Sequence, residues 1–232
     1  MYDKQSFLDE YRKVFTTWSE EQLNDYAEKM AKKYSTIKQG DNVVHLDYYD
    51  GLIDDNDITT IETSLANVNI ELSRFDKNGV PYASLEQFML QVALFLGDKT
   101  TQDVLSGVGT NAIWDAIKSV TFYIWRTVRN RTAIKQTDSK KTLNCGIKMT
   151  LDKNTKFEFK IDGDLSDETA LKSIDKIVEF LKTVTPNQTV KRPDFVTFNQ
   201  EMERWEIVDV NAEMRKLMLA AREKEKNEHK DN

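Results

Sequence analysis

The stretch GVGTNAIWDAIKSVTFYIWRTVRNR, residues 107–131, decides how the rest of the chain can fold. Its apolar residues recur at the three- and four-residue spacing of one helix face. These residues are Ile113, Ile117, Val120, Ile124 and Val128. A second stripe beside the first carries Trp114 and Trp125, so the helix is apolar around much of its circumference. We therefore expect a central helix over residues 110–130 that packs against several neighbours.

A membrane-inserted helix is an alternative interpretation of the same residues. Asp115, Lys118 and Arg126 interrupt the apolar stretch, and charged side chains are costly in hydrocarbon. Residues 84–97, SLEQFMLQVALFLG, are predicted as a second apolar helix, which is too short to cross a bilayer because a span takes about twenty residues. A conditional membrane-acting effector that inserts helices 84–97 and 110–130 together stays open as an alternative.

The two glycines in SGVGTN, residues 106–111, raise the possibility of a phosphate-binding loop before a helix N-terminus. The P-loop motif GxxxxGK followed by Ser or Thr is missing, and Ala112 stands where the dinucleotide motif GxGxxG needs its third glycine. A turn between two helices therefore explains these glycines better.

The overall composition is that of an ordinary folded protein. The chain has 232 residues, of which 39% are hydrophobic and 31% charged, and this length can bury a core without disulfides or metal. Cys145 is the only cysteine, which excludes an internal disulfide and a multi-cysteine zinc site. The first residues lack the basic start and apolar run of a secretion signal. We expect a cytoplasmic protein without a cofactor.

The order of predicted elements indicates the α+β class. Two helices, the second with a capping box from Ser19 to Gln22, precede two strands within residues 42–49 and 67–75. The C-terminal part is predicted as a ββαββα antiparallel sheet with helices on one face. Its last helix begins after Asn211 and gives way to a polar tail.

We divide the chain into a mainly helical region, residues 1–131, and an antiparallel α+β region, residues 132–232. The connecting segment, residues 132–141, is short and polar, so the two regions could also share one core.

Charge is distributed unevenly along the chain. Residues 118–160 carry a net charge of +8 within a chain whose total is −6, and the densest acidic stretch is DYYDGLIDDNDITTIE, residues 47–62. A basic segment of this kind can meet an anionic partner such as nucleic acid, although basic side chains also stabilise the C-terminal end of a helix. The candidate nucleic-acid-binding residues are Arg126, Arg129, Arg131, Lys135, Lys140 and Lys141.

Two further patterns suggest metal chemistry. Glu158 and Lys160, with Asp152 upstream, loosely resemble the PD-(D/E)xK nuclease pattern, which implies acidic metal ligands and a lysine that activates water. Alternation of Glu and Lys on the wet face of a strand gives the same pattern. His45, Asp47 and Asp50 are candidate ligands of a divalent cation, but their spacing does not fit an EF-hand, and an acidic solvated loop explains these residues better.

These observations favour a cytoplasmic, non-catalytic interaction or regulatory protein with an unknown protein partner. The alternative is a nucleic-acid-binding protein or metal-dependent nuclease that uses the basic segment 118–160.

Overall fold

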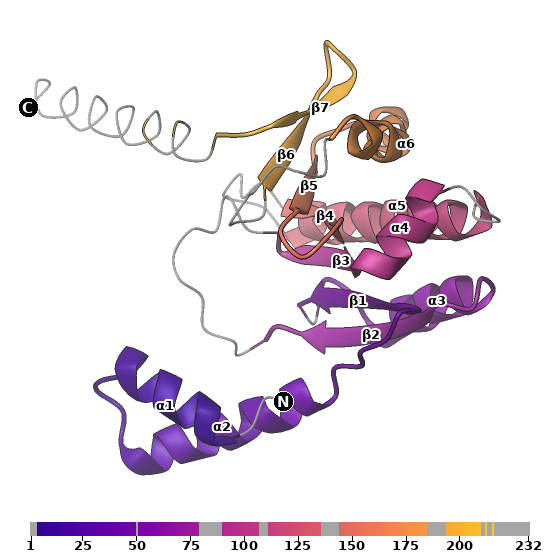
Figure 1. Cartoon of the computed structure of the whole chain (residues 1–232). Helices are drawn as coiled ribbons and strands as arrows, with labels where there is room; N and C mark the ends of the chain where they lie inside the picture. Colours follow the sequence, from indigo (N-terminus) through magenta and orange to yellow (C-terminus); the bar gives the residue numbers. More distant parts are fainter. Residues whose placement is uncertain are drawn as a thin grey trace, which may run out of the picture.

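The structure, a computed structural model, describes residues 4–49, 51–78, 90–106, 111–135, 144–184 and 194–209, together with Ala212 and Arg215. Within these residues there are six helices and one seven-stranded mixed sheet, which confirms the α+β class (Figure 1). The elements in chain order are α1 (Lys4–Val14), α2 (Glu20–Ser35), β1 (Val43–Tyr48), α3 (Asp55–Ala66), β2 (Glu71–Asp76), β3 (Val92–Leu96), α4 (Asp98–Ser106), α5 (Asn111–Lys135), β4 (Asn144–Thr150), β5 (Lys156–Asp162), α6 (Asp167–Thr183), β6 (Asp194–Asn199) and β7 (Arg204–Ile207).

The strands lie in the order β2-β1-β3-β4-β5-β6-β7. Three neighbouring pairs are parallel: β1 with β2, β3 with β4, and β5 with β6. Parallel neighbours need a crossover, which α3, the α4–α5 pair and α6 supply. The predicted order ββαββ is present in the C-terminal part, but the expectation of an antiparallel sheet there is wrong at one place, because α6 carries the chain back so that β6 runs parallel to β5.

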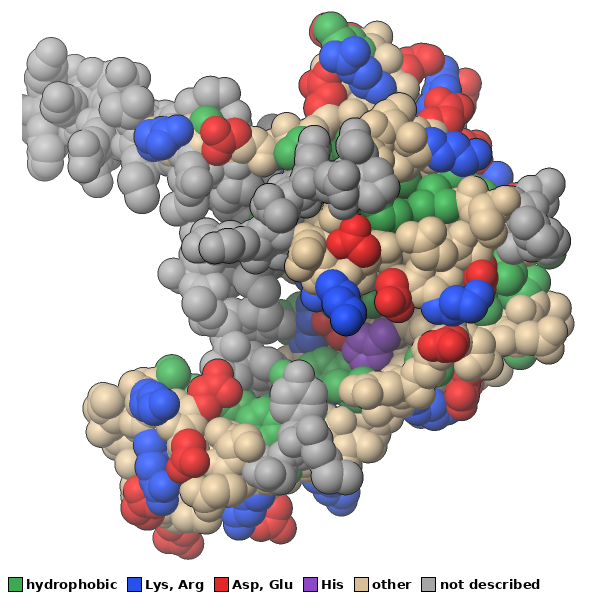
Figure 2. All heavy atoms as spheres, in the orientation of Figure 1, with side chains coloured by type: hydrophobic (Ala, Val, Ile, Leu, Met, Phe, Trp, Pro, Cys, Tyr) green, Lys and Arg blue, Asp and Glu red, His purple; other side chains and the backbone are tan. Residues whose placement is uncertain are grey.

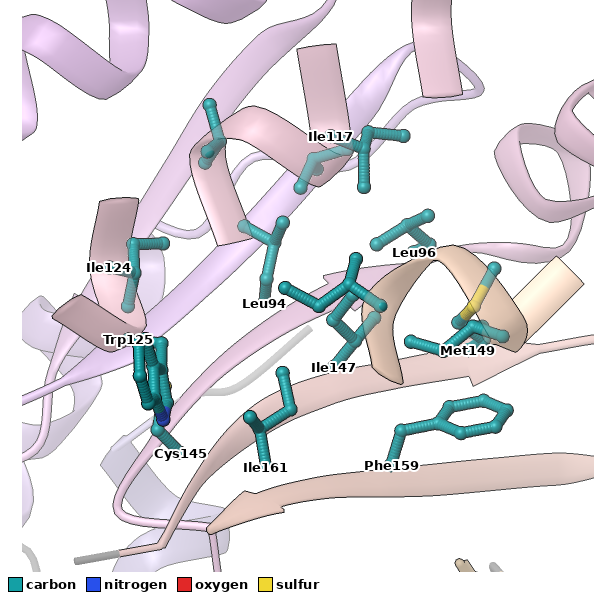
Figure 3. Close-up of a cluster of buried hydrophobic side chains, with 14 of the residues drawn as sticks. Leu94, Leu96, Ile117, Ile124, Trp125, Cys145, Ile147, Met149, Phe159 and Ile161 are labelled. Atoms are coloured by element: carbon teal, nitrogen blue, oxygen red, sulfur yellow. The ribbon is translucent and has the colours of Figure 1, made fainter. Parts of the chain in front are cut away.

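Helix α5 holds the central position that the sequence predicts. It contacts α3, α4 and α6 as well as strand β4. Figure 3 shows Ile117, Ile124 and Trp125 of α5 in one cluster with side chains of the strands, including Leu94 and Ile147. Trp125 is fully buried and its indole N–H donates to the carbonyl of Asp162 at 3.0 Å, whereas Trp114 is only half-buried against the same core.

Strands from both predicted regions belong to the same sheet. Strand β3, from residues 1–131, pairs with β4, from residues 132–232, over five residue pairs. The buried residues of these strands and of α3, α5 and α6 form a single hydrophobic cluster. The two halves of the chain therefore share one core.

The predicted helix over residues 84–97 is wrong where the structure describes it. Val92–Leu96 forms strand β3, in the middle of the sheet, and Ser84 lies outside the described residues. An uninterrupted apolar run is typical of a strand that is buried on both faces, and Ala93 is as buried as its neighbours Val92 and Leu94. Within the described residues, no helix is long and apolar enough to cross a membrane.

The acidic stretch 47–62 contains the start of helix α3, so the expectation of a solvated loop is wrong from Asp55 onward. The carboxylate of Asp54 accepts hydrogen bonds from the backbone N–H groups of Asn56 and Asp57, and Asp57 accepts one from the N–H of Asp54. This capping box satisfies free N–H groups at the first turn. Ile58 and Ile61 are buried, so the helix packs onto the sheet with one apolar face.

The first two helices form a hairpin with a small core of its own. The residues of this second hydrophobic cluster are Phe7, Leu8, Tyr11, Leu23, Ala27 and Met30. The predicted capping box of Ser19 and Gln22 is confirmed. The hairpin contacts the sheet through Tyr34, whose ring lies 4.6 Å from that of Phe75 on β2. The polar C-terminal tail lies outside the described residues.

Candidate functional site

One face of the sheet carries α3–α6, and the other face carries charged side chains at its centre. Because side chains alternate along a strand, the residues between the core positions point away from those helices. The polar face, as we call it, comprises His45 and Asp47 of β1, Phe95 of β3, Lys148 of β4, and Glu158 and Lys160 of β5. Register places His45 opposite Phe95, Phe95 opposite Lys148, and Lys148 opposite Glu158. Figure 2 shows histidine, acidic and basic side chains gathered at a hollow of the surface.

His45 and Asp47, two predicted metal ligands, interact with each other. Nε2 of His45 lies 3.0 Å from Oδ1 of Asp47, and Nδ1 lies 2.9 Å from the hydroxyl of Ser73. On the other side of Asp47, Nζ of Lys77 lies 3.6 Å from Oδ2. The third predicted ligand, Asp50, lies outside the described residues. No group of three or more His, Cys, Asp or Glu side chains within the described residues could hold a metal ion.

Lys77, which directly follows β2, places a buried cation beside the polar face. Its amine donates to the carbonyl of Leu90 at 3.1 Å, and the residue as a whole is 7% exposed. Burial lowers the pKa of Lys77 below that of an ordinary lysine, while the charge of Asp47 acts in the opposite direction. The Lys77 amine thus lies between the carbonyl of Leu90 and the carboxylate of Asp47 on β1.

The predicted nuclease residues are only partly brought together. Glu158 and Lys160 share the polar face of β5, but Glu158 pairs with Lys148 at 3.0 Å and Lys160 pairs with Asp162 at 3.0 Å. Asp152 is in the β4–β5 turn, where its carboxylate accepts hydrogen bonds from the backbone N–H groups of Asn154 and Thr155. These hydrogen bonds lower the pKa of Asp152. The carboxylate of Asp152 thus holds the turn together.

The predicted nucleic-acid-binding arginines point toward two different helix starts. Arg126 and Arg129 lie 3.5 and 2.7 Å from Asp167 at the start of α6. Arg131 lies 2.6 Å from each of Asp54 and Asp57 at the start of α3. The side chain of Lys135 and the whole of Lys140 and Lys141 lie outside the described residues. The described arginines therefore tie helices together through intramolecular ion pairs.

A groove runs along the outer edge of β2, and the sequence interpretation missed it. Figure 1 shows β2 as the outermost strand, on the side of the helical hairpin. The β2 groove, as we call it, has a volume of about 710 Å³. It is lined by residues of α2, the α2–β1 connection, β1, α3 and β2: Lys29, Lys32, Lys33, Thr36, Lys38, Tyr48, Asp55, Glu62, Leu72, Arg74, Phe75 and Asp76.

The lining of the β2 groove is more basic than acidic. It contains five Lys or Arg side chains and three Asp or Glu side chains. Lys33 contributes an ion pair of 3.5 Å to Asp76, and Lys38 one of 2.6 Å to Glu71. Lys32 is exposed and forms no ion pair within the described part of the chain. The sequence could have predicted the basic side of the groove, because Lys29, Lys32 and Lys33 have the spacing of one helix face. It could not have predicted that β2 is an edge strand.

Comparisons with known proteins give no further indication. No protein-family model, curated protein or solved structure matches the chain.

Proposed function

We propose that this chain is a cytoplasmic, non-catalytic interaction protein whose protein partner binds in the β2 groove. One observation carries the proposal: residues of the edge strand β2, together with residues of α2 and α3, line a groove of about 710 Å³. The edge of a sheet offers backbone groups for pairing, and proteins usually cover or blunt such edges. A groove beside such an edge is typical of a surface that receives a partner as an added strand.

The contacts of the polar face support a binding role over a catalytic one. The carboxylates of Asp47 and Glu158 each have a cationic or imidazole partner within 3.0 Å. A nuclease needs carboxylates that converge on a metal ion, and Asp152 is engaged in its turn instead.

Site-specific photocrosslinking tests the proposal. A photoreactive amino acid replaces Lys32, on the exposed wall of the groove, and in a matched control it replaces Glu179, whose side chain is 67% exposed on α6. We expect a discrete protein adduct from position 32 in cells that produce the chain, and none from position 179.

Two results would overturn the proposal. One is the absence of a discrete adduct from position 32, whether or not position 179 gives one. The other is metal-dependent cleavage of nucleic acid by the purified chain that is lost in Glu158→Gln, since that result would make the protein an enzyme.

A further inference from the structure

We infer that the β2 groove receives an extended acidic segment of the partner protein, which adds to the sheet as an eighth strand beside β2. This inference rests on the proposed function and adds the chemistry of the partner to it.

The backbone of β2 provides the first argument. Glu71 donates its N–H to the carbonyl of Asn42 at 2.9 Å, and Lys77 donates to the carbonyl of Tyr48, so the odd-numbered residues face β1. The even-numbered residues Leu72 and Arg74 then direct their N–H and C=O groups toward the outer edge. No strand lies on that side among the described residues. An added strand of about five or six residues would match the length of β2.

The two walls of the groove lie on opposite faces of β2. Helix α2 lies on the side of Phe75, where Nζ of Lys33 is 5.4 Å from the ring centre. Helix α3 lies on the opposite side, where Arg74 is 3.8 Å from Asp55. The wall formed by α2 is therefore basic, and the wall formed by α3 contributes carboxylates.

This arrangement predicts an alternating sequence in the partner. Successive side chains of an added strand point to opposite faces of the sheet. Side chains that face the lysines of α2 should be acidic, whereas those that face Leu72 and the carboxylates Asp55 and Glu62 should be apolar or basic. A segment in which Glu or Asp alternates with Val, Ile or Lys meets both requirements.

A single-stranded nucleic acid is the competing occupant, because it too is anionic. Nucleic-acid binding rests on phosphate charge and base stacking and makes no use of the directional N–H and C=O groups of a strand edge. The groove has both the charge and the edge, so we assign it to a peptide.

Peptide binding to the purified full-length chain tests the inference. The probe is a fluorescently labelled ten-residue peptide in which Glu alternates with Val and Lys, and the matched control has the same composition with all Glu residues grouped. By fluorescence anisotropy, we expect the alternating peptide to bind at least about tenfold more tightly than the grouped control. Only in the alternating peptide can all Glu side chains of an added strand face the lysines of α2.

Methylation of backbone nitrogens in the peptide probe tests strand addition specifically. An added strand pairs through every second N–H group, so methylation of alternate peptide nitrogens should abolish binding in one register and leave it within about threefold in the other. Equal effects in both registers would contradict strand addition. So would equal binding of the grouped control, or tighter binding of an oligothymidine of the same charge.

Variants of the chain locate the binding site. Lys32→Glu should weaken binding about five- to tenfold, since it replaces an attraction by a repulsion, whereas Lys176→Glu on α6 should leave it unchanged. Arg74→Pro should weaken binding more than Arg74→Ala, because proline removes an outward N–H group at an edge position that tolerates it. Unchanged far-ultraviolet circular dichroism verifies the fold.

Failure of the inference and failure of the proposed function give different results. If the photocrosslink from position 32 persists while no peptide binds, strand addition is wrong and the interaction role stands. If the crosslink is also missing, both are wrong.

Discussion

Replacing Arg131 by alanine tests whether the arginines of α5 are structural. The guanidinium makes two ion pairs of 2.6 Å, to Asp54 and Asp57, and donates to the carbonyl of Leu52 at 2.9 Å. Asp57 is 5% exposed, so the variant leaves a buried carboxylate without its cation. Such a loss costs about 3–5 kcal/mol in a fully buried pair.

Two features of the structure reduce that figure for Arg131→Ala. Asp57 keeps hydrogen bonds from the Tyr123 hydroxyl at 2.7 Å and from the Asp54 N–H at 2.9 Å. The Arg131 side chain is 28% exposed, so water reaches part of the pair. We therefore expect the free energy of unfolding to fall by about 2–3 kcal/mol, and the midpoint of thermal unfolding by about 4–12 °C.

The assay is urea unfolding with Arg126→Ala as the matched control. Arg126 is 59% exposed and, among the described residues, has one ion-pair contact, 3.5 Å from Asp167, so its removal should cost less than about 0.5 kcal/mol. The slope of free energy against urea should be the same for both variants. If Arg131→Ala lowers the free energy of unfolding by no more than Arg126→Ala does, the structural role assigned to Arg131 is refuted. If the variant instead loses a nucleic-acid binding that weakens steeply with salt in the parent chain, the nucleic-acid-binding alternative is favoured.

Three further predictions concern the core and its ionisable groups. Trp125→Phe removes the N–H donor to Asp162 and should cost about 2–4 kcal/mol in urea unfolding, against less than about 1.5 kcal/mol for Trp114→Phe; equal costs would contradict the central role of Trp125. Burial raises the pKa of Cys145 to about 12, so at pH 8 the thiol should react with Ellman's reagent only in denaturing urea; rapid reaction of the folded chain would show that β4 is accessible. Because burial lowers the pKa of Lys77, the unfolded chain binds more protons between that pKa and the ordinary lysine value, and this residue's contribution makes stability rise with pH across that interval. In Lys77→Met, the free energy of unfolding should rise less with pH, as measured by urea unfolding at several alkaline pH values. An unchanged dependence on pH would contradict a lowered pKa of Lys77.

Local patterns predicted helices and hairpins well and failed where tertiary context decides. The stripe of α5, the capping box of Ser19 and the alternation of β4 and β5 were readable, because each depends on residues close in sequence. The run Val92–Leu96 has neither helical nor alternating periodicity, so periodicity alone could not identify it as a strand. The N-terminus of helix α3 could have been predicted from the capping box of Asp54 and Asp57, but the many acidic residues around it favoured the interpretation as a solvated loop.

The candidate sites depend on contacts between distant parts of the chain. Arg131 and Asp54 are 77 residues apart, and nothing local indicates that they pair. The β2 groove requires that β2 be an edge strand, and strand order is a property of the whole sheet. The sequence could therefore suggest a basic helix face on α2, but not the strand edge beside it.

The separate core of the α1–α2 hairpin has a consequence for how the molecule opens. None of its buried residues belongs to the large hydrophobic cluster between the sheet and helices α3–α6. Small cooperative units can unfold while the rest of a protein stays native. In native-state hydrogen exchange, the amides of α2 should then exchange at a lower free energy of opening than those of α5. Mild warming would unfold α2, and with it the lysines that line the groove, while strand β2 stays native.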